Sequence, residues 1–206
     1  MIKSADKKLH IFLWASLAIM LVWSGWRPAD RFTWFLEVFP IFLITAVLLS
    51  IYRHFYFSRL VCWLMWLHAI VLLVGGHYTY AEVPLFDWIR DVFHLARNHY
   101  DRLGHFMQGF VPAMISREVL LRRKVLCRGG WSFFIVVSIC LAISASYELI
   151  EWAAAILTGT KAHAFLGSQG DVWDTQWDMA LALLGAILAL SLLGKLHDRS
   201  IDRLDF

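Results

Sequence analysis

Charged residues are scarce in this sequence, because Lys, Arg, Asp and Glu make up only 17% of its 206 residues. Soluble domains carry about 25% charged residues, whereas 60% of this chain is hydrophobic. The hydrophobic residues come in long blocks, which excludes one large soluble core and predicts an all-α, polytopic membrane protein. No polar stretch is long enough for a separate soluble domain, so we expect residues 1–206 to form a single membrane domain.

Cysteine is also rare, and its three positions exclude two classes of site. Cys62, Cys127 and Cys140 have no motif spacing, so they give neither a disulfide framework nor a zinc signature. A signal-peptide cleavage site is missing as well: the N-terminal lysines and the apolar run 9–22 are followed by no small-x-small pattern. We therefore expect an uncleaved first transmembrane helix.

Six apolar stretches predict six transmembrane helices, at about residues 9–26, 32–52, 60–74, 101–115, 131–157 and 174–193. The Gly75-Gly76 pair is expected to end the third helix, and Glu37 to be an exposed acid near the start of the second. Residues 75–99 are too polar to span and are typical of a segment at the membrane surface. The helix at 101–115 is short and polar, so we expect its neighbours to shield it from lipid.

The distribution of basic residues predicts the orientation. Most of the 19 Lys and Arg residues fall in the N-terminus, the 53–59 link, a basic loop at 117–130 and a C-terminal tail after residue 193. These four regions lie on one side of a six-helix arrangement. Because cytoplasmic loops carry the Lys/Arg excess, both termini are expected in the cytoplasm.

Three polar stripes fall near the opposite, non-cytoplasmic side. Within each stripe the residues are three or four positions apart, and so share one helix face. The stripes are Asn98, Asp101, His105 and Gln108; Ser144, Glu148 and Glu151; and Asp171, Asp174 and Asp178. An ionisable residue inside a membrane helix is costly unless it is paired, protonated or bound to a cation, so these residues predict a functional site.

Carboxylates and an imidazole that converge in a low dielectric serve two kinds of chemistry. They bind a divalent metal ion, for which oxygen ligands suit Mg²⁺, Ca²⁺ or Mn²⁺ and histidine suits Zn²⁺ or iron. Alternatively they exchange protons, because crowded carboxylates create an acid beside a base. The candidate metal ligands are Asp101, His105, Glu148, Asp174 and Asp178; the candidate catalytic residues are Glu148, His105 and Asp178; and the candidate substrate-binding residues are Arg102 and Trp177.

Simpler roles stay open for several of these residues. Asp171 and Asp174 are suited to capping the last helix, as Asp commonly does. Asp178 is too deep for a cap, and its alternative is an ion pair with Arg102 or Arg97. Trp177 fits an interfacial aromatic belt.

The segments 100–106, 147–152 and 170–178 resemble the YjdF-type inner-membrane proteins, a bacterial family of unknown function. The resemblance covers nearly the whole chain and implies a multi-pass protein of the bacterial inner membrane. More distantly, the chain is similar to VanZ-like proteins, some of which are linked to glycopeptide-antibiotic resistance. That similarity is carried by Asp101, Arg102, His105, Phe106, Glu148, Asp174 and Asp178.

The chain departs from the VanZ-like pattern at three site positions. Arg102 replaces the usual lysine, while Glu151 and Asp178 stand where glutamine and asparagine are typical. The two acidic changes weaken any transfer of VanZ-like function and favour a cation site.

The leading functional prediction is an acidic, periplasm-facing intramembrane site that acts on, or binds, a lipid-linked or cell-envelope substrate, with a divalent metal ion as the cofactor. Two alternatives stay open: a proton-coupled transporter, and a non-catalytic accessory protein whose polar cluster is structural. Membrane lipids are the expected partners. Nucleic-acid binding is not expected, because membrane topology and anionic lipid explain the basic loop.

Overall fold

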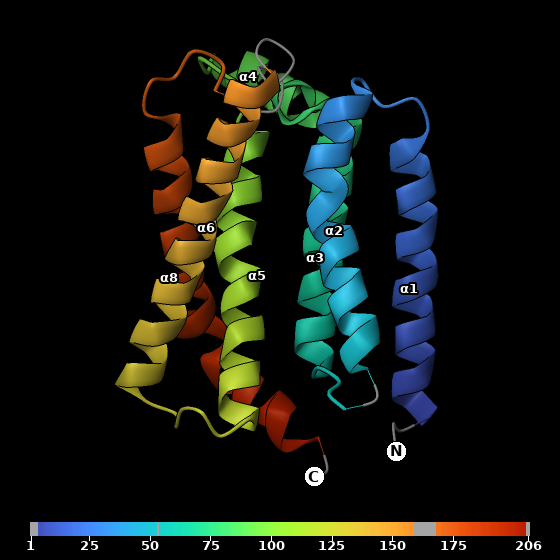
Figure 1. Ribbon diagram of the computed structural model, residues 1–206, viewed down its shortest axis with the longest axis vertical. Coiled ribbons are helices and arrows are strands. Elements are labelled where there is room, and N and C mark those ends of the chain that lie inside the picture. The colour runs from blue at the N-terminus through green and yellow to red at the C-terminus, as the bar shows by residue number, and fades with distance from the viewer. Residues whose placement is uncertain (1–3, 53, 159–167, 205–206) are drawn as a thin grey trace. The chain divides into compact units, whose positions relative to one another are not determined.

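The computed structural model describes residues 4–52, 54–158 and 168–204, and this part of the chain is helical with no strand (Figure 1). Five of its helices are long and apolar enough to cross a membrane. They are α1 (Ser4–Gly25), α2 (Arg31–Ile51), α3 (Arg59–Tyr78), α6 (Gly130–Thr158) and α8 (Asp174–Asp202). The all-α membrane fold is thus confirmed, whereas a sixth span and the side of the termini stay predictions.

The chain divides into two compact units, Met1–Tyr100 and Asp101–Phe206. In the first unit, α1 and α2 both pack on α3 (Figure 1). The buried core there joins Val38 and Ile41 of α2 to Ala69 and Leu73 of α3. The single membrane domain expected from the sequence remains a prediction.

The glycine pair of α3 does not end the helix, contrary to the sequence expectation. The helix continues to Tyr78, and the chain turns at Thr79, where φ is +59°. A Cβ on Gly75 would clash with the ring of Tyr80. These glycines therefore permit close packing inside a helix, a role that a sequence cannot distinguish from helix termination.

Glu37 is buried, with 5% of its surface exposed, so the prediction of an exposed acid is wrong. It lies on the α2 face that packs on α3. There Gly76 has no side chain, and a Cβ added to it would lie 3.5 Å from the Glu37 Cβ. The missing side chain leaves room for Glu37 between the two helices.

The polar segment after α3 forms a 3₁₀ turn, η1 (Tyr80–Glu82), and a short helix, α4 (Pro84–Phe93). None of the α4 residues is buried. Leu85, Trp88 and Val92 recur at helical spacing and are exposed, while Asp87 and Arg90 form an ion pair of 2.8 Å. This amphipathic pattern fits the expected segment at the membrane surface.

The second unit contains α6, α8 and a further helix, α5 (Tyr100–Arg122), which run side by side (Figure 1). No residue of α5 is exposed, while its expected shielding from lipid stays a prediction. Two boundaries differ from expectation: Arg117 and Arg122 lie in α5 rather than in the basic loop, and Lys195 and Arg199 lie in α8 rather than in a tail. The helices are longer because many of their polar residues pair with one another, as described below.

A seam of small residues joins α5 to α8. Gly109 lies directly against the backbone of Ala182, and Gly185 lies directly against the backbone of Phe106, so a Cβ at either glycine would clash. Close backbone approach of this kind is how small residues pack membrane helices together. The seam fixes how far α8 is shifted along α5. It therefore determines which side chains of the two helices meet on either side of the seam.

Candidate functional site

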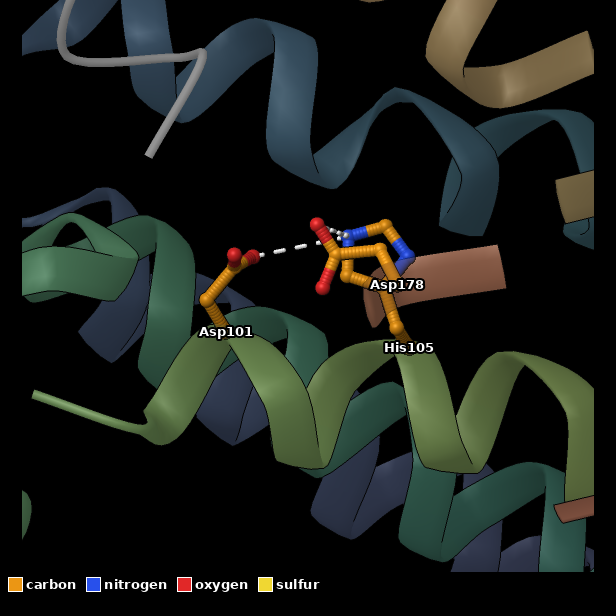
Figure 2. Close-up of side chains that lie close together, drawn as sticks. All are labelled: Asp101, His105 and Asp178. Carbon is orange, nitrogen blue, oxygen red and sulfur yellow. Dashed lines mark ion pairs between the residues drawn. The ribbon is translucent and has the colours of Figure 1, made fainter. Parts of the chain in front are cut away.

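His105 of α5 lies at the centre of the candidate site. Its Nε2 is 3.5 Å from Asp101 Oδ1, one helical turn earlier, and 3.8 Å from Asp178 Oδ2 on α8 (Figure 2). One ligand atom from each of the three residues lies within 4.8 Å of the others, and all three residues are buried. Two residues of the first stripe and one of the third, far apart in sequence, are thus brought together.

The second stripe reaches the same centre from α6. Glu148 Oε1 lies 3.7 Å from His105 Nδ1, and Thr175 hydrogen-bonds the Glu148 carboxylate. Glu151 acts electrostatically on His105, as Asp174 does on Asp178. We call the six residues the acidic site: Asp101, His105, Glu148, Glu151, Asp174 and Asp178.

All six residues of the acidic site are buried, so five carboxylates share low-dielectric surroundings with one imidazole. Two of the buried carboxylate oxygens, Glu148 Oε1 and Asp178 Oδ1, accept no hydrogen bond. The Ser144 hydroxyl, one turn before Glu148, is also buried without a hydrogen-bond partner. Like charges 4 Å apart repel by about 4 kcal/mol at an effective dielectric constant of 20, so the site requires bound positive charge, as protons or as a cation.

Gln108 contacts the Nδ1 side of the His105 ring, opposite the nitrogen that faces Asp101 and Asp178. Its Oε1 lies 3.2 Å from His105 Nδ1. In the tautomer with its proton on Nδ1, the ring donates this hydrogen bond to the Gln108 amide oxygen, which only accepts. In the neutral ring, the Nε2 lone pair then points between Asp101 and Asp178, which is the orientation of a metal-binding histidine whose other nitrogen is held by an acceptor.

Asn98, the first residue of its stripe, has a different role. It belongs to the first unit, where its Oδ1 accepts a hydrogen bond of 3.0 Å from the backbone N–H of Tyr100 at the start of α5. Its Nδ2 donates to the Val83 carbonyl oxygen. Asn98 thus acts at the start of α5.

Arg102 pairs with Asp171, so the expected ion pair between Arg102 and Asp178 is wrong, whereas the one with Arg97 stays a prediction. The Arg102 Nη2 to Asp171 Oδ2 distance is 3.0 Å, and the guanidinium lies over the Trp177 ring, 5.4 Å from its centroid. Asp171 Oδ1 also accepts a hydrogen bond from the backbone N–H of Trp173, just before α8. The two candidate substrate-binding residues, Arg102 and Trp177, therefore lie in contact.

A cavity of about 230 Å³ adjoins the acidic site. Three site carboxylates line it, those of Glu148, Glu151 and Asp174, together with Asp171 and Thr175. This volume corresponds to roughly seven or eight water molecules at about 30 Å³ each. It suits a hydrated ion or a small polar group rather than an acyl chain.

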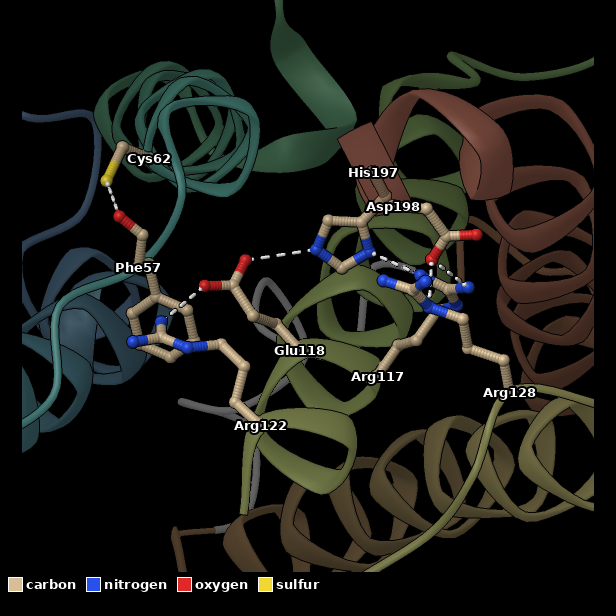
Figure 3. Close-up of polar contacts among 8 residues, drawn as sticks. All are labelled: Phe57, Cys62, Arg117, Glu118, Arg122, Arg128, His197 and Asp198. Carbon is tan, nitrogen blue, oxygen red and sulfur yellow. Dashed lines mark hydrogen bonds and ion pairs between the residues drawn. The ribbon is translucent and has the colours of Figure 1, made fainter. Parts of the chain in front are cut away.

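A second cluster of charges, which the sequence did not predict as a unit, occupies the other end of α5 and α8 (Figure 3). His197 Nε2 lies 3.0 Å from Glu118 Oε2, and neither residue is exposed. Around this pair, Asp198 forms ion pairs with Arg117 and Arg128, and Arg128 also pairs with Asp202. Arg122 forms an ion pair with Glu118. We call this set of residues the distal network. Its members are Arg117, Glu118, Arg122, Arg128, His197, Asp198 and Asp202.

The distal network is separate from the acidic site. Glu118 lies thirteen residues after His105 on α5, which is roughly 20 Å along a helix. The sequence signal was present, because Glu118 and Arg122 are four residues apart on one helix face. It was missed because Arg117 and Arg122 were assigned to a loop.

Comparison with known proteins gives two matches. Residues 9–199 match a family described as predicted membrane protein (DUF2238). The chain is also 45% identical over 188 residues to the inner membrane protein YjdF of Escherichia coli (strain K12), and the match covers 91% of this chain and 90% of that protein. No solved structure matches. The resemblance to YjdF-type proteins is confirmed.

Proposed function

Because this chain belongs to the DUF2238 family of predicted membrane proteins and is an inner-membrane protein, we propose that its acidic site binds a divalent cation on the periplasmic side. The cation would serve a lipid-linked or cell-envelope substrate held beside it. The observation that carries the proposal is the buried triad Asp101, His105 and Asp178. Ligands bonded to one metal ion at about 2.0–2.2 Å are themselves about 3–4 Å apart, which agrees with the 3.5 and 3.8 Å distances.

The residues divide into three roles. Asp101, His105 and Asp178 would be the first ligands, with Glu148 and Asp174 completing the coordination. A bound cation would polarise a substrate oxygen or acidify a bound water. Glu148 lies 3.7 Å from His105 and lines the cavity, so it is placed to exchange a proton with a group bound there. Arg102 and Trp177 would hold an anionic part of the substrate.

The periplasmic assignment is supported by charge within the second unit. The distal network and its flanking basic residues, Arg123, Lys124 and Arg199, belong to the end of α5 and α8 opposite the acidic site. Because Lys and Arg are concentrated on the cytoplasmic side, the acidic site would face the periplasm.

The transporter and accessory-protein hypotheses remain alternatives. The seam of Gly109 and Gly185 argues against a path between α5 and α8, because the two backbones are in direct contact between the acidic site and the distal network. The accessory hypothesis has to account for the unpartnered oxygens of Glu148 and Asp178, since a purely structural polar network satisfies its buried members.

Metal analysis of purified protein tests the proposal. Wild-type protein purified in Mn²⁺-containing buffer and then desalted is expected to retain metal, while Asp178→Asn and Glu148→Gln are expected to lose it. Asp91→Asn on α4 is the matched control, because it removes an exposed carboxylate outside the site. Metal-free wild-type protein, or site variants that keep wild-type metal content, would contradict the proposal.

A further inference from the structure

Arg102 is an incompletely satisfied cation whose ion-pair partner, Asp171, lines the cavity. Its Nη2 binds one oxygen of Asp171, but its Nε is buried and has no hydrogen-bond partner. A guanidinium offers five donors in a planar fork, and the match for that fork is an oxyanion with two oxygens in one plane. The bond to Asp171 therefore leaves donor capacity for another anion.

The surroundings hold this fork in place. The Trp177 ring lies 5.4 Å from the guanidinium carbon, so the fork stacks on an aromatic face. Asp171, its partner, lines the cavity that Glu148 and Asp174 also line. An anion in this cavity would thus lie between the Arg102 fork and the acidic site, in the position that the Asp171 carboxylate now takes.

We propose that Arg102 binds a phosphate group in this cavity, and that Asp171 occupies Arg102 until phosphate displaces it. This inference rests on the proposed function, because the carboxylates would repel phosphate unless a divalent cation neutralised them. A divalent cation held by carboxylates commonly completes its coordination with substrate phosphate oxygens. Phosphate would then bridge the cation and Arg102.

The depth of the site favours a phosphate that belongs to a lipid. Trp152 lines the cavity, and it is at least half exposed, as are Trp173 and Trp177 at the start of α8. Exposed tryptophans mark the level of lipid headgroups. The cavity accommodates a phosphate with a few waters but no acyl chain, so the chain of a lipid would remain in the bilayer. Inorganic phosphate has the same binding chemistry, and the experiment separates the two sources.

Calorimetric titration of the purified full-length protein in detergent, with Mg²⁺ present, tests the proposal. The probes are inorganic phosphate and, in separate mixed micelles, a short-chain phosphatidic acid. Asp171→Asn removes a partly exposed ion pair that competes with phosphate for Arg102. The loss of this pair, about 0.5–1 kcal/mol, is expected to tighten phosphate binding about two- to fivefold. Arg102→Gln is expected to abolish binding, and Arg102→Lys to weaken it because the fork is lost.

Arg90 and Asp91 of α4 provide the matched control, as an Arg–Asp pair of 2.9 Å outside the site. Arg90→Gln and Asp91→Asn are expected to leave the titration unchanged. Phosphatidic acid binding without inorganic phosphate binding would assign the site to lipid, and binding of both would assign it to the phosphate group itself. An Asp171→Asn variant that binds no more tightly than wild type, or wild-type protein that binds neither probe, would overturn the proposal.

Metal content of the same samples distinguishes this inference from the proposed function. Metal-loaded protein without phosphate binding contradicts only the phosphate site. Metal-free protein contradicts the proposed function, and phosphate binding that persists in EDTA contradicts the link between cation and phosphate. If Arg102→Gln does not fold, the tightening expected for Asp171→Asn decides the question alone.

Discussion

His105 on α5 and Asp178 on α8 face each other with 3.8 Å between Nε2 and Oδ2. This pair exists only because the two helices have one particular shift along each other. The close backbone contacts at Gly109 and Gly185 set that shift, and they lie between the acidic site and the distal network. Packing of small residues and placement of charged ligands are therefore two parts of one arrangement in the second unit.

Replacing Gln108 tests whether it positions His105. Gln108→Leu removes the acceptor of the Nδ1 hydrogen bond, so the ring can turn or carry its proton on Nε2. Loss of such a supporting contact typically lowers metal affinity by about 10–100-fold. We expect this loss in a Mn²⁺ titration of Gln108→Leu, with a much smaller effect for Gln108→Glu, which keeps an acceptor. Equal affinities of both variants and wild type would contradict the positioning role.

Glu118 is expected to be structural. Glu118→Ala leaves His197 and Arg122 buried without their carboxylate, and breaking a buried pair in this way costs about 3–5 kcal/mol. We expect a large drop in the midpoint of thermal unfolding in detergent but unchanged metal content at low temperature. Asp202→Ala, whose partner Arg128 is half exposed, is the control and is expected to be nearly neutral. A variant with wild-type stability would show that the distal network does not hold the helices together.

The α5–α8 seam gives opposite predictions for two glycines. Gly109→Ala forces a Cβ into the backbone of Ala182, which requires the helices to move apart. It is expected to destabilise the protein and also to lower metal affinity, because His105 and Asp178 separate. Gly194→Ala, later in α8, meets nothing within 4 Å and is expected to stabilise by about 0.5–1 kcal/mol through helix propensity. Thermal unfolding and Mn²⁺ titration of the two variants would measure both effects, and similar behaviour would contradict the seam.

Asp30 gives a pH-dependent contribution to stability. A hydrogen bond of 2.7 Å from the Thr33 backbone N–H caps α2 and holds the pKa of the Asp30 carboxyl below its usual range. A lowered folded-state pKa means that this stability is present above the usual Asp pKa and is lost as pH falls through the lowered value. Asp30→Ala should therefore cost about 0.5–1 kcal/mol at neutral pH and less in acid. Asp30→Asn keeps a capping acceptor and should remove only the pH dependence, as unfolding at several pH values would reveal.

The membrane fold and the acidic site were predictable because both depend on periodic patterns. Apolar blocks predicted six spanning helices, of which five are long and apolar enough to cross a membrane in the part of the chain that the structure describes. Spacings of three and four residues placed Asp101 with His105 on one face. The burial of Glu37 and the continuation of α3 through Gly75 were not predictable. Both depend on which neighbouring helix comes close, and a glycine that permits contact has the same sequence signal as a glycine that ends a helix.

The sequence also could not predict which charged residues form pairs between helices. Arg102 had acidic candidates on several segments, and only the folded chain selects Asp171 over Asp178. The distal network was not predicted for a related reason. Basic residues near a helix end are typical of a cytoplasmic loop, but here the buried pair of Glu118 and His197 allows α5 and α8 to continue through these residues. Charges that neutralise one another inside a bundle are not distinguishable by composition from charges in solvent.

X-ray absorption spectroscopy of Mn²⁺-loaded protein in nanodiscs tests the central claim most directly. The account predicts oxygen ligands and one imidazole nitrogen at about 2.0–2.3 Å, with the imidazole signal absent in His105→Asn. Manganese that is retained without an imidazole ligand, or that is not retained at all, would contradict a cation site built on His105, Asp101 and Asp178.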